Sequence, residues 1–238
     1  MQRIPRLVIG LIALSVGASA LAKDEAPVLR WTEGEPGCTF SADEDGLYRY
    51  GLWTDEFGII MAVDADELRK TISRTEPTFE LLLTVSYRGK DSLAVRPDGM
   101  SLEFVKHDHD KHAAIMLDDL SAKLQKDSGT LSERAQRQMR NHPGKKTAEE
   151  AARQELQKSI QRTIEFVKSE GLAVTRLDAS HTEISGWVFF SAKSKWIGDW
   201  KQQEEFVLRI PLANRIVEFP FALPPSKGDL ILRRRPSE

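Results

Sequence analysis

The chain has only one cysteine in 238 residues, Cys38. A single thiol cannot form an internal disulfide, and a chain of this length buries enough apolar surface to fold without one. In an oxidising compartment a lone thiol pairs between chains, reacts, or lies buried as a small hydrophobe, and we favour the buried state. Nothing in the sequence supplies a base that would activate Cys38.

The motifs of common catalytic sites are also missing. The sequence has no Gly-x-Ser-x-Gly elbow, no Ser-x-x-Lys, no His-Glu-x-x-His and no phosphate-binding Gly-x-x-x-x-Gly-Lys. Asp178, Ser180 and His181 lie close along the chain, but a triad needs a spatial arrangement that proximity does not provide. The sequence therefore gives no argument for an enzyme.

Charge of one sign is not concentrated. The chain carries 34 basic and 36 acidic side chains, and its one basic run is Arg233-Arg234-Arg235. Nucleic-acid binding requires clustered Lys and Arg, so we expect no nucleic-acid partner. We interpret the arginine run as part of a solvated C-terminal tail, residues 226–238.

Only one apolar run is long, and it lies at the N-terminus. Two arginines precede the uncharged stretch Leu7–Val16, and Ala18-Ser19-Ala20 or Ala20-Leu21-Ala22 offers a small-x-small cleavage site. The rival interpretation is a membrane anchor, but the run falls short of the roughly 20 apolar residues that span a bilayer. We therefore predict a signal peptide over residues 1–22. The mature protein would be periplasmic or secreted, with no membrane attachment and a net charge of about −4 (36 acidic against 32 basic side chains).

Strand patterns occur on both sides of a helical block. The clearest is the alternation of Phe79, Leu81, Leu83, Val85 and Tyr87, which places five apolar side chains on one face. Further strand signals extend over residues 38–106 and 172–223. Prolines in the second range restrict its strands to ends or edges.

The helical block is predicted from apolar spacing. Leu117, Leu120 and Leu124 form a narrow stripe, and Asp127-Ser128-Gly129 is expected to end that helix. A polar helix over 132–141 and a long one over 148–170 complete the block, and a short helix is expected over 65–73.

These patterns predict a mainly β fold with an α insertion (α+β). It resembles an immunoglobulin-like antiparallel β-sandwich interrupted by a helical hairpin, although the paired Cys and intervening Trp of true immunoglobulin domains are absent. The expected organisation is a flexible N-terminal segment over 23–37 and one sandwich domain over 38–225, with the helical insertion at 111–170. The alternative is two halves joined by the helices.

Three of the five histidines fall within six residues, at His107, His109 and His112. If the preceding strand continues, His107 and His109 project to one side, which suits two imidazole ligands of zinc or another divalent metal. The competing interpretation is a polar strand-to-helix loop in which an aspartate caps the next helix. The sequence supplies no other cofactor signal.

Trp196 and Trp200 lie in a Lys-rich loop between two strands, where exposed indoles would stack on sugars or peptides. A tryptophan folded over the edge of the sandwich is the commoner arrangement.

Three functional hypotheses follow. The leading one is an exported, non-catalytic binding or interaction module of the cell envelope, which binds a protein partner or itself through the helical insertion. The second is a metal-binding protein or metal-dependent enzyme that uses the histidine cluster. The third is a carbohydrate-binding module that uses Trp196 and Trp200.

Overall fold

The fold is described from a computed structural model of the chain, in which residues 26–42, 47–64, 77–141, 146–193, 196 and 203–225 are described. The predicted signal peptide, the short helix over 65–73, Trp200 and the C-terminal tail lie outside these residues.

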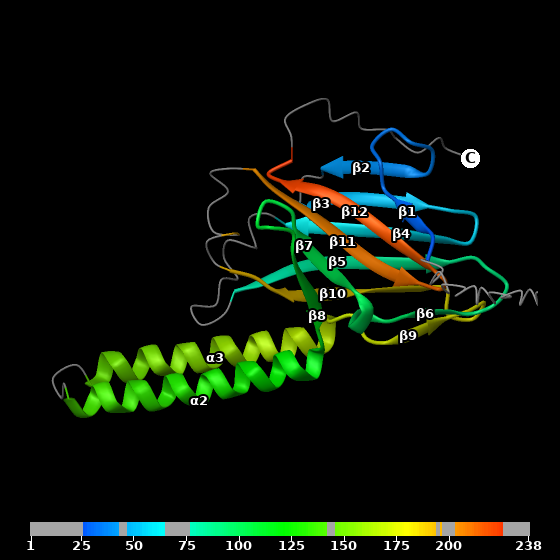
Figure 1. The fold of residues 1–238 in the computed structure, drawn as a ribbon. Coiled ribbons are helices and arrows are strands. Elements are labelled where there is room, and N and C mark those ends of the chain that lie inside the picture. The colour runs from blue at the N-terminus through cyan, green and yellow to red at the C-terminus, as the bar shows by residue number, and fades with distance from the viewer. Residues whose placement is uncertain are drawn as a thin grey trace, which may run out of the picture.

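The described chain is mainly β, with a single ten-stranded sheet and two helices beside it (Figure 1). The strand order across the sheet is β1-β12-β11-β7-β8-β10-β5-β4-β3-β2. The strands are β1 (Val28–Arg30), β2 (Cys38–Ala42), β3 (Leu47–Trp53), β4 (Phe57–Asp64), β5 (Thr78–Tyr87), β7 (Ser101–Phe104), β8 (Asp110–Ile115), β10 (Glu183–Ser191), β11 (Glu204–Leu212) and β12 (Arg215–Leu223). A separate pair, β6 (Leu93–Val95) and β9 (Thr175–Leu177), lies below the ten-stranded sheet in the view of Figure 1, and a 3₁₀ turn, η1 (Pro97–Gly99), precedes β7.

The sheet curls on itself, so that its two halves face each other across the core. Phe79 on β5 contacts Phe104 on β7 and Phe206 on β11, with ring centroids 6.2 and 5.0 Å apart. The strict alternation of burial along β5 confirms the period-2 prediction, and Phe79, Leu81, Leu83 and Val85 are fully buried.

This architecture corrects the expectation of two stacked sheets, and the immunoglobulin-like sandwich is not confirmed. Strand β8 pairs with β7 on one side and with β10 on the other, and so joins the two halves into one half-barrel. Strands that precede the helices in the chain lie next to strands that follow them, and both groups share one core. Two separate halves joined by the helices would each have their own sheet and core.

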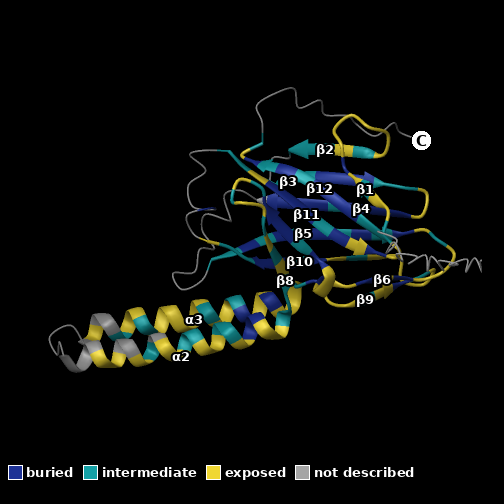
Figure 2. Cartoon of the chain, viewed as in Figure 1, coloured by how far each residue is buried: buried dark blue, intermediate teal, exposed yellow. Residues whose placement is uncertain are grey.

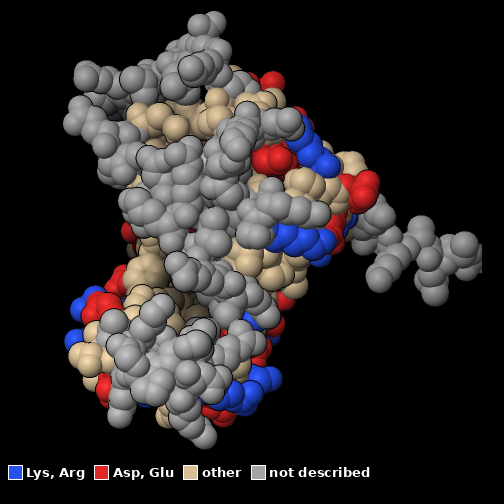
Figure 3. Space-filling model, turned by 90° about the vertical axis from the view of Figure 1, so that its left-hand side faces the viewer, with Lys and Arg blue, Asp and Glu red and all other residues tan. Residues whose placement is uncertain are grey.

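The helical insertion is an antiparallel pair, α2 (Leu117–Asn141) and α3 (Lys146–Glu170). Near the sheet, Leu120 and Val167 bury Phe189 on the outer face of β10. Further out the pair projects past the ends of the strands, where buried positions give way to exposed and half-buried ones (Figure 2). Acidic and basic residues are interspersed over the pair on the face drawn in Figure 3.

Three expected boundaries are wrong. The first helix does not end near Gly129, because one glycine and two polar residues cost a helix too little to break it. The helical block begins at Leu117 rather than at residue 111, because residues 110–115 form β8. The N-terminal segment expected to be flexible contains β1, a strand of three residues that is too short to show a periodic signal.

Candidate functional site

The curled sheet does not close, and an open groove of about 380 Å³ lies where its two edges approach each other. Residues from both edges line it, with Trp31 following β1 and Phe40 on β2. We call this site the seam groove. Beyond Glu218, β12 pairs with no described strand on its β1 side, so an open strand edge borders the groove at Pro220.

Aromatic rings form the floor and walls of the seam groove. Tyr50 packs edge-on against Trp31 and Phe40, with centroids 5.1 and 4.8 Å apart, and tilts against Phe221 at 5.8 Å. Phe206 stacks on Phe221 at 5.0 Å. Most of each ring is buried, with 7 % of Trp31, 4 % of Tyr50 and 6 % of Phe221 exposed, so only the ring surface that faces the groove can contact an apolar side chain or a flat group.

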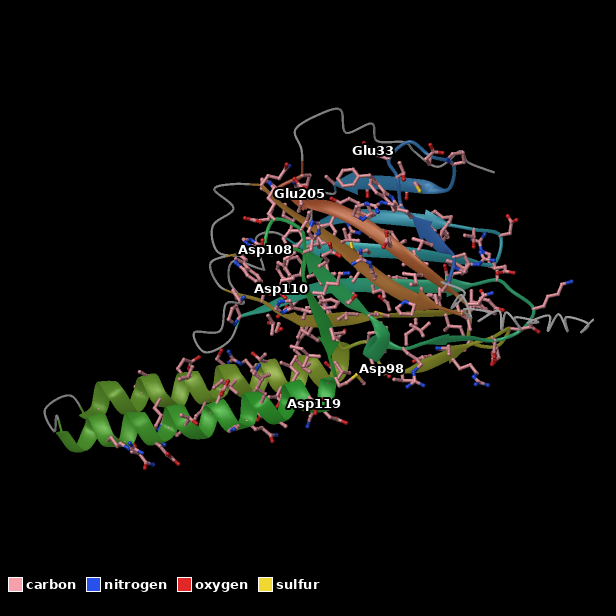
Figure 4. All side chains as sticks on the ribbon, viewed as in Figure 1. Glu33, Asp98, Asp108, Asp110, Asp119 and Glu205 are labelled. Carbon is pink, nitrogen blue, oxygen red and sulfur yellow. The ribbon has the colours of Figure 1, made fainter. Side chains whose placement is uncertain are left out.

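Two exposed carboxylates, Glu33 and Glu205, lie at the groove, on the same upper side of the sheet in Figure 4. Glu33 forms no hydrogen bond or ion pair with another described residue, whereas Glu205 lies 3.4 Å from Lys106 Nζ. That exposed pair is worth at most about 1 kcal/mol, so a cation on a ligand can replace Lys106.

Among the described residues that line the groove, the one basic side chain, Arg30, is paired with a carboxylate. Its Nη1 donates to Glu218 Oε2 at 3.0 Å. Burial raises the pKa of Tyr50 far above its ordinary value, with smaller contributions from Tyr48 and Glu33, so its phenol stays neutral at physiological pH. The described lining therefore combines neutral rings with two exposed carboxylates and one arginine that is already paired.

The salt bridge of Arg30 belongs to a charge ladder on the outer face of the sheet. Arg209 on β11 donates to both Glu218 on β12 and Glu103 on β7. Burial alone would raise the pKa of Glu103. Hydrogen bonds from Arg209 and His109, together with the charge of Lys111, outweigh burial, so the pKa lies below its ordinary value. The ladder ties four neighbouring strands together and holds Arg30 beside the groove.

The three clustered histidines do not converge. The strand before them ends at Phe104, and residues 105–109 form the turn of the β7–β8 hairpin, so neither the extended strand nor the strand-to-helix loop is correct. Asp108 and His109 both have a φ of 56°, and this left-handed backbone reverses the chain just before β8 begins.

Each imidazole meets a different carboxylate. His107 Nε2 lies 3.1 Å from Glu204, His109 Nδ1 lies 2.5 Å from Glu103, and His112 Nε2 lies 3.2 Å from Asp110. No group of three or more His, Cys, Asp or Glu among the described residues is arranged to hold a metal ion. The geometry gives the metal hypothesis no support.

His112 also lies 2.6 Å from Ser191 Oγ through Nδ1, so Ser191, His112 and Asp110 form one hydrogen-bonded chain. The chain extends the short pairing of β8 with β10, which otherwise covers only Phe189 and Phe190 on the β10 side. Phe104 packs on the imidazole at 5.1 Å, and Lys193 lies 3.6 Å from Asp110. These contacts account for the chain as a structural link, which the sequence did not signal.

Trp196 is buried, with 6 % of its surface exposed. Its ring stacks on His107 with centroids 4.4 Å apart, and Lys193 Nζ lies 4.1 Å from its centre. This indole therefore packs over the end of the sheet, and a sugar would have to displace those contacts to reach it.

Cys38 is half-buried and packs against the core, and its sulfur accepts a hydrogen bond from the Thr32 N–H at 3.4 Å. No helix within the described ranges is long and apolar enough to cross a membrane.

Comparison of the chain with protein-family models, with curated proteins and with solved structures finds no match in any of the three.

Proposed function

We propose that the protein is an exported, non-catalytic binding module that holds an extended peptide segment in the seam groove. The observation that carries this proposal is the open aromatic groove between two sheet edges, with carboxylates at its rim. The N-terminal sequence supports export, because it has the three parts of a signal peptide.

The groove chemistry defines the class of ligand. Apolar side chains gain by leaving water for the rings of Trp31, Tyr50 and Phe221, and a neighbouring Arg or Lys gains from Glu33 and Glu205. The preferred peptide therefore combines aliphatic side chains with basic ones.

The open edge of β12 favours an extended ligand, because a strand can add beside it. Pro220 removes one backbone donor from that edge, so side-chain burial carries more of the binding than a continuous ladder does. A volume of about 380 Å³ is at the small end for a ligand site, and we expect affinities of about 1–100 μM.

The test is a fluorescence-anisotropy titration of the protein with two labelled seven-residue peptides, one alternating Leu with Arg and the other alternating Leu with Glu. We expect saturable binding of the arginine peptide only. Glu33→Lys should weaken it about tenfold, equivalent to about 1.4 kcal/mol. Glu183→Lys, an exposed carboxylate on β10 away from the groove, is the matched control and should leave binding unchanged. Equal binding of both peptides, or of neither, would contradict the proposal.

A further inference from the structure

The seam groove lies directly beside the start of the C-terminal segment. Pro225, the last described residue, itself lines the groove. The 13 residues that follow, 226–238, read Ser-Lys-Gly-Asp-Leu-Ile-Leu-Arg-Arg-Arg-Pro-Ser-Glu. The sequence pattern alone suggested a solvated tail, but Pro225 places the start of this segment at the groove.

This segment has the composition that the groove selects. Leu230-Ile231-Leu232 is an apolar run rich in strand-forming character, and three arginines follow it at once. The apolar run matches the aromatic walls, and the arginines match Glu33 and Glu205.

The segment is also long enough to reach the groove. Five residues lead from Pro225 to Leu230, and an extended chain covers about 17 Å over that distance. A segment tethered so close has an effective concentration on the order of 1 mM at the groove. With an intrinsic Kd of about 0.1 mM, it would fill the groove about nine-tenths of the time and weaken a competing ligand about tenfold.

We propose that residues 229–235 occupy the seam groove of their own chain and so regulate its access to external peptides. This inference rests on the proposed peptide-binding function of the groove. The segment acts as a built-in competitor, and only ligands that exceed its effective concentration displace it.

The first test compares the full chain with a chain that ends at Pro225, using the labelled Leu-Arg peptide as probe. Removal of the segment should tighten binding about tenfold, and the triple variant R233E/R234E/R235E, which keeps the length, should tighten it similarly. Lys227→Glu is the control that changes a charge outside the arginine run. Equal affinity of the full and shortened chains would overturn this inference alone, whereas absence of binding to both would overturn the proposed function.

The second test locates the segment. A spin label is attached at Ile231→Cys in a Cys38→Ser background, and the indole N–H signals are followed by NMR. The inference predicts strong broadening of the Trp31 indole, with little effect on Trp187, which lies across the sheet beneath the helical pair. Broadening of Trp187 but not Trp31, or of neither, would contradict it.

Discussion

The indole N–H of Trp31 donates to the carbonyl oxygen of Thr39 at 3.1 Å. Trp31 follows β1 and Thr39 lies on β2, so this bond joins the two edges of the ten-stranded sheet. The backbone N–H of Trp31 donates to Glu218 at 2.8 Å and fixes the residue to β12. One side chain thus links the two edges of the sheet beside the seam groove.

Replacing Trp31 should separate its two contributions. Trp31→Phe keeps an aromatic ring but removes the donor, and we expect a loss of about 1 kcal/mol in the free energy of unfolding. Trp31→Ala also empties the space against Tyr50 and should cost about 3–5 kcal/mol. Urea unfolding followed by circular dichroism measures both. Unchanged stability of Trp31→Phe would show that the bond between the edges carries no separate weight, and equal losses for the two variants would show that the ring carries none.

Two glycines should respond in opposite ways to alanine. A Cβ at Gly129, in the middle of α2, meets no atom within 4 Å, so Gly129→Ala should stabilise the protein by about 0.5–1 kcal/mol. A Cβ at Gly186 would lie 2.7 Å from the backbone of Leu172, where the chain leaves α3 and crosses β10. Gly186→Ala should therefore destabilise it by about 1–3 kcal/mol.

The same urea titration checks both glycine variants. A destabilised Gly129→Ala variant would indicate a break in α2, as the sequence pattern suggested. A neutral Gly186→Ala variant would mean that the crossing of the chain over β10 is not tightly packed.

Acid should weaken the protein through Glu103. Its pKa in the folded state lies below the ordinary value of about 4.3, so its contribution to stability is complete above that value and is lost as the pH falls through the folded pKa. The free energy of unfolding should decline as the pH falls below about 5.

Glu103→Gln should flatten that decline and cost about 2 kcal/mol at pH 7, because Arg209 loses a charged partner. Glu183→Gln is the exposed control and should leave the profile unchanged. An identical acid slope in the wild type and Glu103→Gln would exclude the charge ladder as its source.

The local pattern of the sequence predicts the elements well and their assembly poorly. The alternation from Phe79 to Tyr87 and the stripe of Leu117, Leu120 and Leu124 depend on neighbours along the chain, and both describe real elements. The curled sheet depends on β8, because this strand joins the two halves. Its Lys-His-Ala-Ala sequence has the apolar pattern of neither a strand nor a helix, so it could not be predicted.

The seam groove could not be predicted because its walls come from distant parts of the chain. Trp31 and Phe221 are 190 residues apart, and only the closure of the sheet brings them to one site. The histidine cluster shows the opposite case. Density along the chain suggested a shared site, but the β7–β8 turn sends His107, His109 and His112 to three different carboxylates.

Peptide binding in the seam groove is tested by the Trp31 indole N–H signal in a ¹H–¹⁵N NMR spectrum, assigned through Trp31→Phe, during addition of the Leu-Arg peptide to the full chain. We predict that this signal shifts progressively to saturation, while the Trp187 indole beneath the helical pair stays in place. If the peptide saturates the protein and the Trp31 signal does not shift, binding lies outside the seam groove and the proposed function is wrong.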